Sequence, residues 1–220
     1  MRIKGIIFDL DGTLIDSLHC WERADRNFLL ENGIEPPPGV SDIMKKLSMK
    51  EAAQFFIDLG VNMTHEAVTE RIEELVFDEY ASKVPLKKYA LELLDILDNL
   101  GIVYCVATAN YRSLTDVILK RFGIFDRFRF IYTCAENGIK KDAPSFFSNV
   151  GVLLGTSPEE TAVLDDSFHC LKNAHDSGFF TAAVFDETTA DWDEAVNVSD
   201  ISVNDLQEFA EYIKKEVDIA

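Results

Sequence analysis

The sequence has few cysteines, and their spacing suits neither a disulfide framework nor a zinc site. The 220 residues include four cysteines that form no CxxC pair and follow no regular spacing: Cys20, Cys105, Cys134 and Cys170. Secreted domains of this size that depend on disulfides carry more cysteines in recognisable patterns, whereas isolated thiols are typical of reducing compartments. We therefore expect a cytoplasmic protein.

Long apolar runs are also missing. No apolar stretch approaches the ~18 residues that a membrane-spanning helix needs. The apolar run near the N-terminus is interrupted by Asp9, which leaves it too short for the apolar part of a signal peptide. The sequence therefore predicts neither a membrane span nor a secretion signal.

Positive charge is scarce. Lysine and arginine number 21 against 39 aspartates and glutamates, so the formal net charge is −18. A surface this acidic repels nucleic acids and anionic lipids, and we expect neither as a partner. An anionic substrate would need local positive charge, supplied by a metal ion or by a well-placed lysine.

The remaining composition is that of a folded globular protein. Apolar residues make up 47% of the chain and charged residues 27%. Short apolar runs of strand length alternate with helical patterns, at residues 3–8, 102–108, 128–133, 161–166 and 179–185. This alternation predicts an α/β fold with a doubly wound parallel sheet. Residues 16–85 carry only helical patterns, so we expect a catalytic core made of residues 1–15 and 86–220, with a helical insertion after the first strand.

Polar residues follow the predicted strands at the points where ligands bind in open parallel sheets. Asp9 and Asp11 come after the first strand and Asp165 and Asp166 after a later one, while the other candidates are Thr108, Ala109, Asn110 and a lysine at position 140 or 141. Carboxylate oxygens suit Mg²⁺, and a hydroxyl and an ammonium group suit phosphoryl oxygens. An ionised carboxylate can also attack phosphorus. The pattern therefore predicts metal-assisted phosphoryl transfer.

Four motifs occur in an order that resembles the haloacid dehalogenase superfamily. They are Asp9-Leu10-Asp11-Gly12-Thr13, Thr108, Lys141 with Pro144, and Asp165-Asp166-Ser167. The resemblance covers the whole chain, and the helical insertion is similar to the cap of the phosphoglycolate-phosphatase-like and β-phosphoglucomutase-like branch. It implies a HAD-like Rossmannoid core with an inserted helical cap, and Mg²⁺ as the cofactor.

The resemblance also implies roles for the acidic residues. Asp9 would be the nucleophile and a ligand of Mg²⁺. Asp11 would act as general acid and then as general base, and its backbone carbonyl would bind the metal. Asp166 would be the second metal-binding carboxylate, with Asp165 as a neighbouring or water-mediated partner.

The phosphate-binding and substrate-binding roles fall on the loops and on the cap. Thr108 and Lys141 would hold the phosphoryl oxygens, helped by the backbone around Ala109 and Asn110. The usual Gly-Lys-Pro lysine motif is replaced by Gly138-Ile139-Lys140-Lys141-Asp142, so Lys140 stays an alternative to Lys141. Candidate substrate contacts in the cap are His19 and Lys45.

The predicted function is a Mg²⁺-dependent phosphatase that hydrolyses a small phosphorylated metabolite through an aspartyl-phosphate, as a monomer or a small homo-oligomer. A sugar-phosphate mutase would use the same residues and is the first alternative. A phosphonatase with Lys45 or Lys46 as its Schiff-base lysine is a lesser alternative. Asp11 argues against a dehalogenase, because expulsion of a halide needs no proton donor. A catalytically silent module that binds phosphate or metal is the non-enzymatic alternative.

Overall fold

The computed structural model describes residues 3–17, 19–44, 47 and 49–218. The chain divides into two compact units. The first, here called the core unit, takes in Met1–Leu18 and Pro85–Ala220, and the second, the helical unit, takes in His19–Val84. The predicted insertion, residues 16–85, differs from the helical unit by three residues at its start and one at its end.

The described part of the core unit holds a six-stranded parallel sheet in the order β3-β2-β1-β4-β5-β6. The strands are β1 (Gly5–Phe8), β2 (Val103–Thr108), β3 (Ile131–Thr133), β4 (Thr161–Asp165), β5 (Phe180–Val184) and β6 (Ile201–Val203). β1 and β4 are buried along their whole length, as strands covered on both faces are. β1 pairs with β2 on one side and with β4 on the other, which places it in the middle of the sheet.

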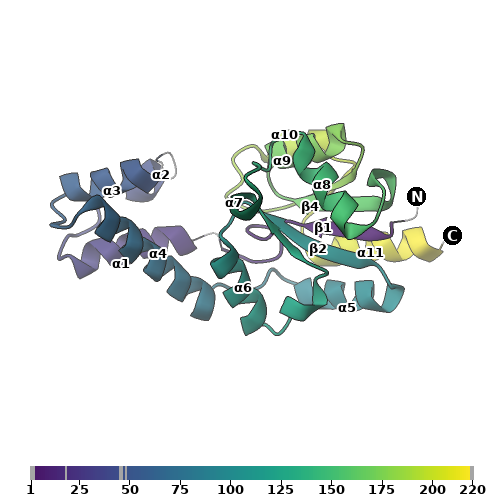
Figure 1. Ribbon diagram of the computed structural model, residues 1–220, viewed down its shortest axis with the longest axis horizontal. Coiled ribbons are helices and arrows are strands. Elements are labelled where there is room, and N and C mark those ends of the chain that lie inside the picture. The colour runs from purple at the N-terminus through teal and green to yellow at the C-terminus, as the bar shows by residue number, and fades with distance from the viewer. Residues whose placement is uncertain (1–2, 18, 45–46, 48, 219–220) are drawn as a thin grey trace. The chain divides into compact units, whose positions relative to one another are not determined.

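Helices cover both faces of this sheet. They are α5 (Ala90–Leu100), α6 (Arg112–Arg121), α7 (Cys134–Asn137), α8 (Ser145–Leu154), α9 (Phe168–Asp176), α10 (Trp192–Val198) and α11 (Leu206–Asp218). Figure 1 shows α8 and α9 on one side of the sheet and α5 and α11 on the other. The buried face of α8, with Phe146, Phe147 and Val150, packs against Ile7 and Val163 of the central strands. The doubly wound parallel sheet predicted from the sequence is therefore confirmed.

Some short elements escaped the sequence analysis. One is α7 (Cys134–Asn137), whose first turn is capped by the Thr133 hydroxyl accepting from the backbone N–H of Glu136 at 3.2 Å. α10 and β6 were not predicted either. β6 is only three residues long with one of them buried, and so short a run carries no readable periodicity.

The helical unit contains α1 (Cys20–Glu31), α2 (Val40–Met44), α3 (Met49–Asp58) and α4 (His65–Ser82). Its core joins α1 to α3 through the rings of Phe28 and Phe56, whose centroids lie 4.9 Å apart in an edge-to-face arrangement. Val68, Ile72 and Tyr80 of α4 are also buried, at the helical spacing that the sequence shows. No helix within the described ranges combines the length and the apolar character that crossing a bilayer requires.

Two segments of the core unit connect it to the helical unit along the chain. Residues 14–16 precede the helical unit and residues 85–87 follow it, and they pair with each other in antiparallel fashion through Ile15 and Leu86. The backbone N–H of Asp16 donates to the carbonyl of Pro85, and that of Lys87 donates to the carbonyl of Leu14, both at 2.9 Å. The two linkers therefore form a small paired element directly after the Asp9–Thr13 motif.

Candidate active site

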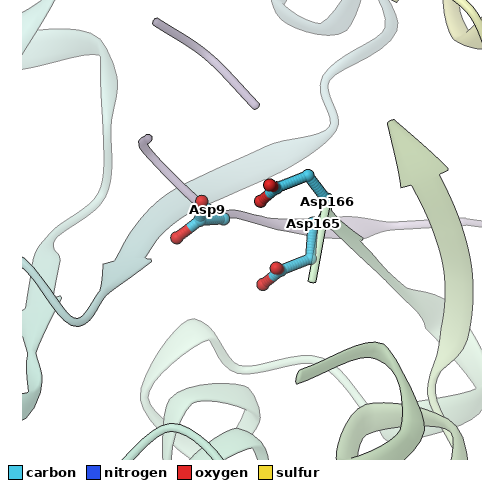
Figure 2. Close-up of side chains that lie close together, drawn as sticks. All are labelled: Asp9, Asp165 and Asp166. Carbon is cyan, nitrogen blue, oxygen red and sulfur yellow. The ribbon is translucent and has the colours of Figure 1, made fainter. Parts of the chain in front are cut away.

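The carboxyl ends of β1 and β4 bring three acidic side chains together. Asp9 directly follows β1, and its backbone N–H donates to the carbonyl of Leu164 in β4 at 2.9 Å. Asp165 ends β4 and Asp166 follows it. One carboxylate oxygen from each of Asp9, Asp165 and Asp166 lies within 4.8 Å of the other two (Figure 2). We call these three residues the acidic cluster.

A buried lysine contacts the acidic cluster. Lys141 forms ion pairs with Asp9 and with Asp165, the latter at 2.6 Å between Nζ and Oδ2. Its side chain is 8% exposed, whereas Lys140 is exposed to solvent. The sequence did not decide between Lys140 and Lys141, and in the structure it is Lys141 that contacts the acidic cluster.

The loop that carries Lys141 is held by an asparagine on α9. The side-chain amide of Asn173 donates to the carbonyl of Lys141 at 3.0 Å and to the carbonyl of Ala143 at 2.8 Å. Two hydrogen bonds from one rigid helix fix the backbone on both sides of Asp142. They explain how a loop without regular structure presents a lysine at a defined place.

The acidic side chains of the site outnumber its basic ones, and this shifts their pKa values. Burial raises the pKa of Asp9 well above its usual range, and repulsion from Asp165 and Asp166 adds to this, while Lys141 opposes it. Burial and the neighbouring Asp165 raise the pKa of Asp166 to about 6. For Lys141, burial works against the charged form, but Asp165 and Asp9 outweigh it and hold its pKa well above the usual value.

This arrangement fits a divalent cation. Three carboxylates face one ammonium group, and a cation held between them would lower the carboxylate pKa values by opposing their repulsion. Oxygen-only donors are those that Mg²⁺ prefers. Both oxygens of Asp165 are engaged, Oδ2 by Lys141 and Oδ1 by the Ser167 backbone N–H at 3.0 Å. The ion pair of Asp9 with Lys141 uses Oδ1 of Asp9, so Asp9 and Asp166 are the better placed ligands.

The turn after Asp11 allows Asp166 to approach. Gly12 has φ +81°, and a Cβ atom built there would lie 2.9 Å from both Cγ and Oδ2 of Asp166. A side chain at this position would therefore be strained in its backbone and would strike the carboxylate. Glycine at position 12 therefore allows both the turn and the close approach of Asp166.

Asp11 lies beside the cluster and contacts the loop after β2. Its Oδ2 accepts a hydrogen bond from the Asn110 side-chain amide at 2.8 Å. The Asn110 backbone N–H donates to the buried hydroxyl oxygen of Thr108 at 3.0 Å. Ala109 is exposed. The structure therefore brings together the ends of β1 and β2, as expected for neighbouring parallel strands.

The last two candidate substrate contacts from the sequence are His19 and Lys45. His19 is an exposed residue of the helical unit, and its Nδ1 lies 3.0 Å from Oε2 of Glu22. Lys45, like Lys46, lies outside the described residues.

The structure adds contacts that sequence reasoning missed. The hydroxyl of Thr189, in the loop after β5, donates to Oδ2 of Asp166 at 2.7 Å. Asn173 holds the Lys141 loop from α9. Neither residue belongs to a motif, and each reaches the site from a segment that becomes adjacent only when the chain folds.

Comparison with known proteins identifies the family. Residues 6–184 match the model of the haloacid dehalogenase-like hydrolases, and the chain belongs to this family. Hexitol phosphatase A from Escherichia coli (strain K12) is 28% identical over 172 residues, which are 76% of this chain and 76% of that protein. Beta-phosphoglucomutase from Bacillus subtilis (strain 168) is 22% identical over 190 residues, 83% of each chain. The crystal structure of CbbY from Rhodobacter sphaeroides in complex with phosphate has the same fold, with a TM-score of 0.75 and 20% identity over 94% of this chain and 96% of that one.

Proposed function

We propose that this protein is a Mg²⁺-dependent phosphatase that hydrolyses a small phosphomonoester through an aspartyl-phosphate on Asp9. The observation that carries the proposal is that Asp9 forms an ion pair with a buried lysine and lies close to two further carboxylates at one edge of the sheet. The similarity to hexitol phosphatase A supports the same reaction class. The substrate class is a small phosphorylated metabolite.

In the first step an oxygen of Asp9 attacks the phosphorus, and the ester P–O bond breaks as the new bond forms. Lys141, whose Nζ lies 2.6 Å from Oδ2 of Asp165, neutralises phosphoryl charge. The Thr108 hydroxyl, whose oxygen accepts from the Asn110 backbone N–H, donates its proton to a phosphoryl oxygen. Asp11 gives its proton to the departing oxygen.

In the second step Asp11, now ionised, takes a proton from a water molecule. The water oxygen bonds to phosphorus, the P–O bond to Asp9 breaks, and inorganic phosphate leaves with the carboxylate of Asp9 restored. Asn110 holds Asp11 in one orientation for both proton transfers. Mg²⁺ bound by Asp9, Asp166 and the backbone carbonyl of Asp11 would supply charge that offsets the repulsion between phosphate and carboxylates.

The helical unit has the proposed role of a cap that selects the substrate. It is inserted between two linkers, of which the first directly follows the Asp9–Thr13 motif in the chain and the second pairs with the first through Leu86 and Ile15. His19 is the first residue of this unit and is the candidate substrate contact that the described residues offer.

The test is phosphate release from a panel of phosphorylated sugars, polyols and hydroxy acids, measured with Mg²⁺ and with EDTA. The wild type is expected to release phosphate from at least one ester in Mg²⁺ and none in EDTA, and Asp9→Asn is expected to be inactive. Equal release by wild type and Asp9→Asn would overturn the proposal.

A sugar-phosphate mutase is the second candidate, favoured by the similarity to beta-phosphoglucomutase over 83% of the chain. Both reactions use the same aspartyl-phosphate, but a mutase returns the phosphoryl group to the sugar. Incubation with a hexose 1-phosphate separates them: free phosphate indicates the phosphatase, and an isomeric hexose phosphate indicates the mutase.

A further inference from the structure

The loop after β5 reaches the acidic cluster through one side chain. Thr189 is partly buried, and its hydroxyl donates to Oδ2 of Asp166 at 2.7 Å. The loop runs between β5 and α10, and none of its residues belongs to the four motifs. Its contact with Asp166 is therefore unexplained by the chemistry already described.

Two neighbours confine the Asp166 carboxylate. The Gly12 backbone comes so close that a Cβ there would lie 2.9 Å from Oδ2. The Thr189 hydroxyl donates to the same oxygen. A carboxylate fixed in this way loses little further freedom when it binds a cation, because its rotation is already restricted.

Asp186 organises the loop that carries Thr189. It is buried at 2% exposure, and its Oδ1 accepts from both the backbone N–H and the hydroxyl of Thr188, the N–H at 2.9 Å. Its backbone carbonyl accepts from the N–H of Thr189 at 3.2 Å. These bonds close a tight turn and set the direction in which the Thr189 side chain points.

Lys87 anchors this turn to the linker that follows the helical unit. Its Nζ donates to Oδ2 of Asp186 at 2.7 Å and to the carbonyl of Phe185 at 3.2 Å. Its backbone N–H donates to the carbonyl of Leu14 in the other linker at 2.9 Å. Burial favours the neutral form of Asp186, but the hydrogen bonds from Lys87 and Thr188 outweigh it and hold the pKa of Asp186 below its usual value.

We propose that Thr189 is a positioning residue that holds the Asp166 carboxylate ready for Mg²⁺, and that the Lys87–Asp186 ion pair fixes the turn that presents Thr189. The proposal rests on the Mg²⁺ site of the proposed function and adds three residues to it. It assigns a role to the loop after β5 and links the metal site to the linkers.

The first measurement is Mg²⁺ binding to the substrate-free protein by isothermal titration calorimetry. Thr189→Val keeps the branched shape and removes the hydroxyl, and we expect it to weaken Mg²⁺ binding about tenfold. Thr189→Ser keeps the hydroxyl and is expected to stay within about twofold of the wild type. Lys87→Met is expected to weaken binding about threefold, because the turn persists but loses its anchor.

Thr181→Val is the matched control. Thr181 also donates its hydroxyl to an aspartate, Oδ2 of Asp200 at 3.0 Å, but it lies near the start of β5 and not in the loop that follows this strand. It is expected to bind Mg²⁺ like the wild type. Far-UV and near-UV circular dichroism verify that each variant is folded, and Lys87→Met carries the test if Thr189→Val does not fold.

The second measurement is the Mg²⁺ concentration that gives half-maximal phosphate release. For Thr189→Val it is expected to rise about tenfold, while kcat at saturating Mg²⁺ stays within about threefold of the wild type. Mg²⁺ affinity equal to that of the wild type in Thr189→Val, or an equal loss in Thr181→Val, would overturn the positioning role. Weakened binding in Thr189→Val, in a protein that hydrolyses no phosphate ester, would support the positioning role and refute the proposed function.

Discussion

Asn110 and Asp11 are joined by a hydrogen bond of 2.8 Å from the side-chain amide to Oδ2. The amide cannot flip without cost, because its Oδ1 accepts the backbone N–H of Tyr111 at 2.7 Å. Asn110 therefore presents an N–H group, not an oxygen, to the proposed general acid, and it fixes one of the two oxygens of Asp11.

Replacement of Asn110 by alanine should impair proton transfer more than binding. We expect kcat for an alkyl phosphate to fall about tenfold, because Asp11 loses its fixed orientation. For an aryl phosphate the loss should be smaller, because a good leaving group needs little protonation. Steady-state kinetics on both esters checks this. Asn32→Ala is the control, since its amide donates to Phe28 in the helical unit; equal losses on both esters would contradict an orienting role.

Gly12→Ala should damage the metal site through a direct clash. The new methyl group would lie 2.9 Å from the Asp166 carboxylate in a backbone with φ +81°. We expect a loss of about 1–2 kcal/mol in the free energy of unfolding and a loss of Mg²⁺ affinity of at least tenfold.

Gly123→Ala provides the control for this change. Gly123 has φ +67°, but a Cβ atom there would meet no heavy atom within 4 Å. It should show a similar loss of stability in urea unfolding and no change in Mg²⁺ binding by calorimetry. Equal Mg²⁺ affinity in the two glycine variants would refute the clash.

Lys141→Met should abolish most of the activity, because Asp9 and Asp165 would lose the cation that both contact. We expect kcat/KM to fall by at least about 10²-fold, as for the loss of other preorganised charge partners of a reacting group. Lys140→Met should retain wild-type activity, since Lys140 is exposed. The measurement is phosphate release by the two variants side by side, and the opposite ranking would assign the phosphate-binding role to Lys140.

Asp25 should make the stability of the protein depend on pH. This residue of α1 is buried, and burial together with the nearby Glu22 raises the pKa of its carboxyl to about 7. Between about pH 4 and about pH 7 the folded chain keeps the proton while the unfolded chain releases it, so stability falls as the pH rises through this window and levels off above it. The loss attributable to Asp25 is up to about 4 kcal/mol.

Urea unfolding across this pH range tests the prediction. Asp25→Asn should make the decline shallower, because the amide does not titrate, while Asp9 and Asp166, whose pKa values burial also raises, keep their share of it. Asp58→Asn, an exposed residue of α3 in the same unit, should leave the profile of the wild type unchanged. An unaltered decline in Asp25→Asn would show that other groups cause it.

The α/β architecture could be predicted from the sequence, because the patterns that indicate strands and helices involve only residues close together in the chain. Apolar runs of strand length, each followed by a helical pattern, need only neighbouring residues to be recognised, and five of the six strands of the described sheet were predicted in this way. Where an element was too short to establish a period, as in β6, the same reasoning failed.

The acidic residues of the site could also be named in advance, because the carboxyl ends of parallel strands meet at one edge of the sheet. Asp9 and Asp11 follow β1, Asp165 ends β4 and Asp166 follows it. The choice between Lys140 and Lys141 could not be made from two adjacent, chemically equal lysines. It depends on which side chain the Asn173-held loop turns inward.

The sequence by itself thus determined the parallel α/β core, the helical insertion and the set of acids at the sheet edge, since each depends on periodicity or on position along a strand. Only the tertiary structure decided that Lys141 forms ion pairs with Asp9 and Asp165. It also decided that Thr189 donates a hydrogen bond to Asp166, and that Lys87 forms an ion pair with Asp186 in the same loop. These contacts join segments that lie 23 to 132 positions apart in the chain. No local pattern records such contacts, because packing of the whole sheet and its helices brings the segments together.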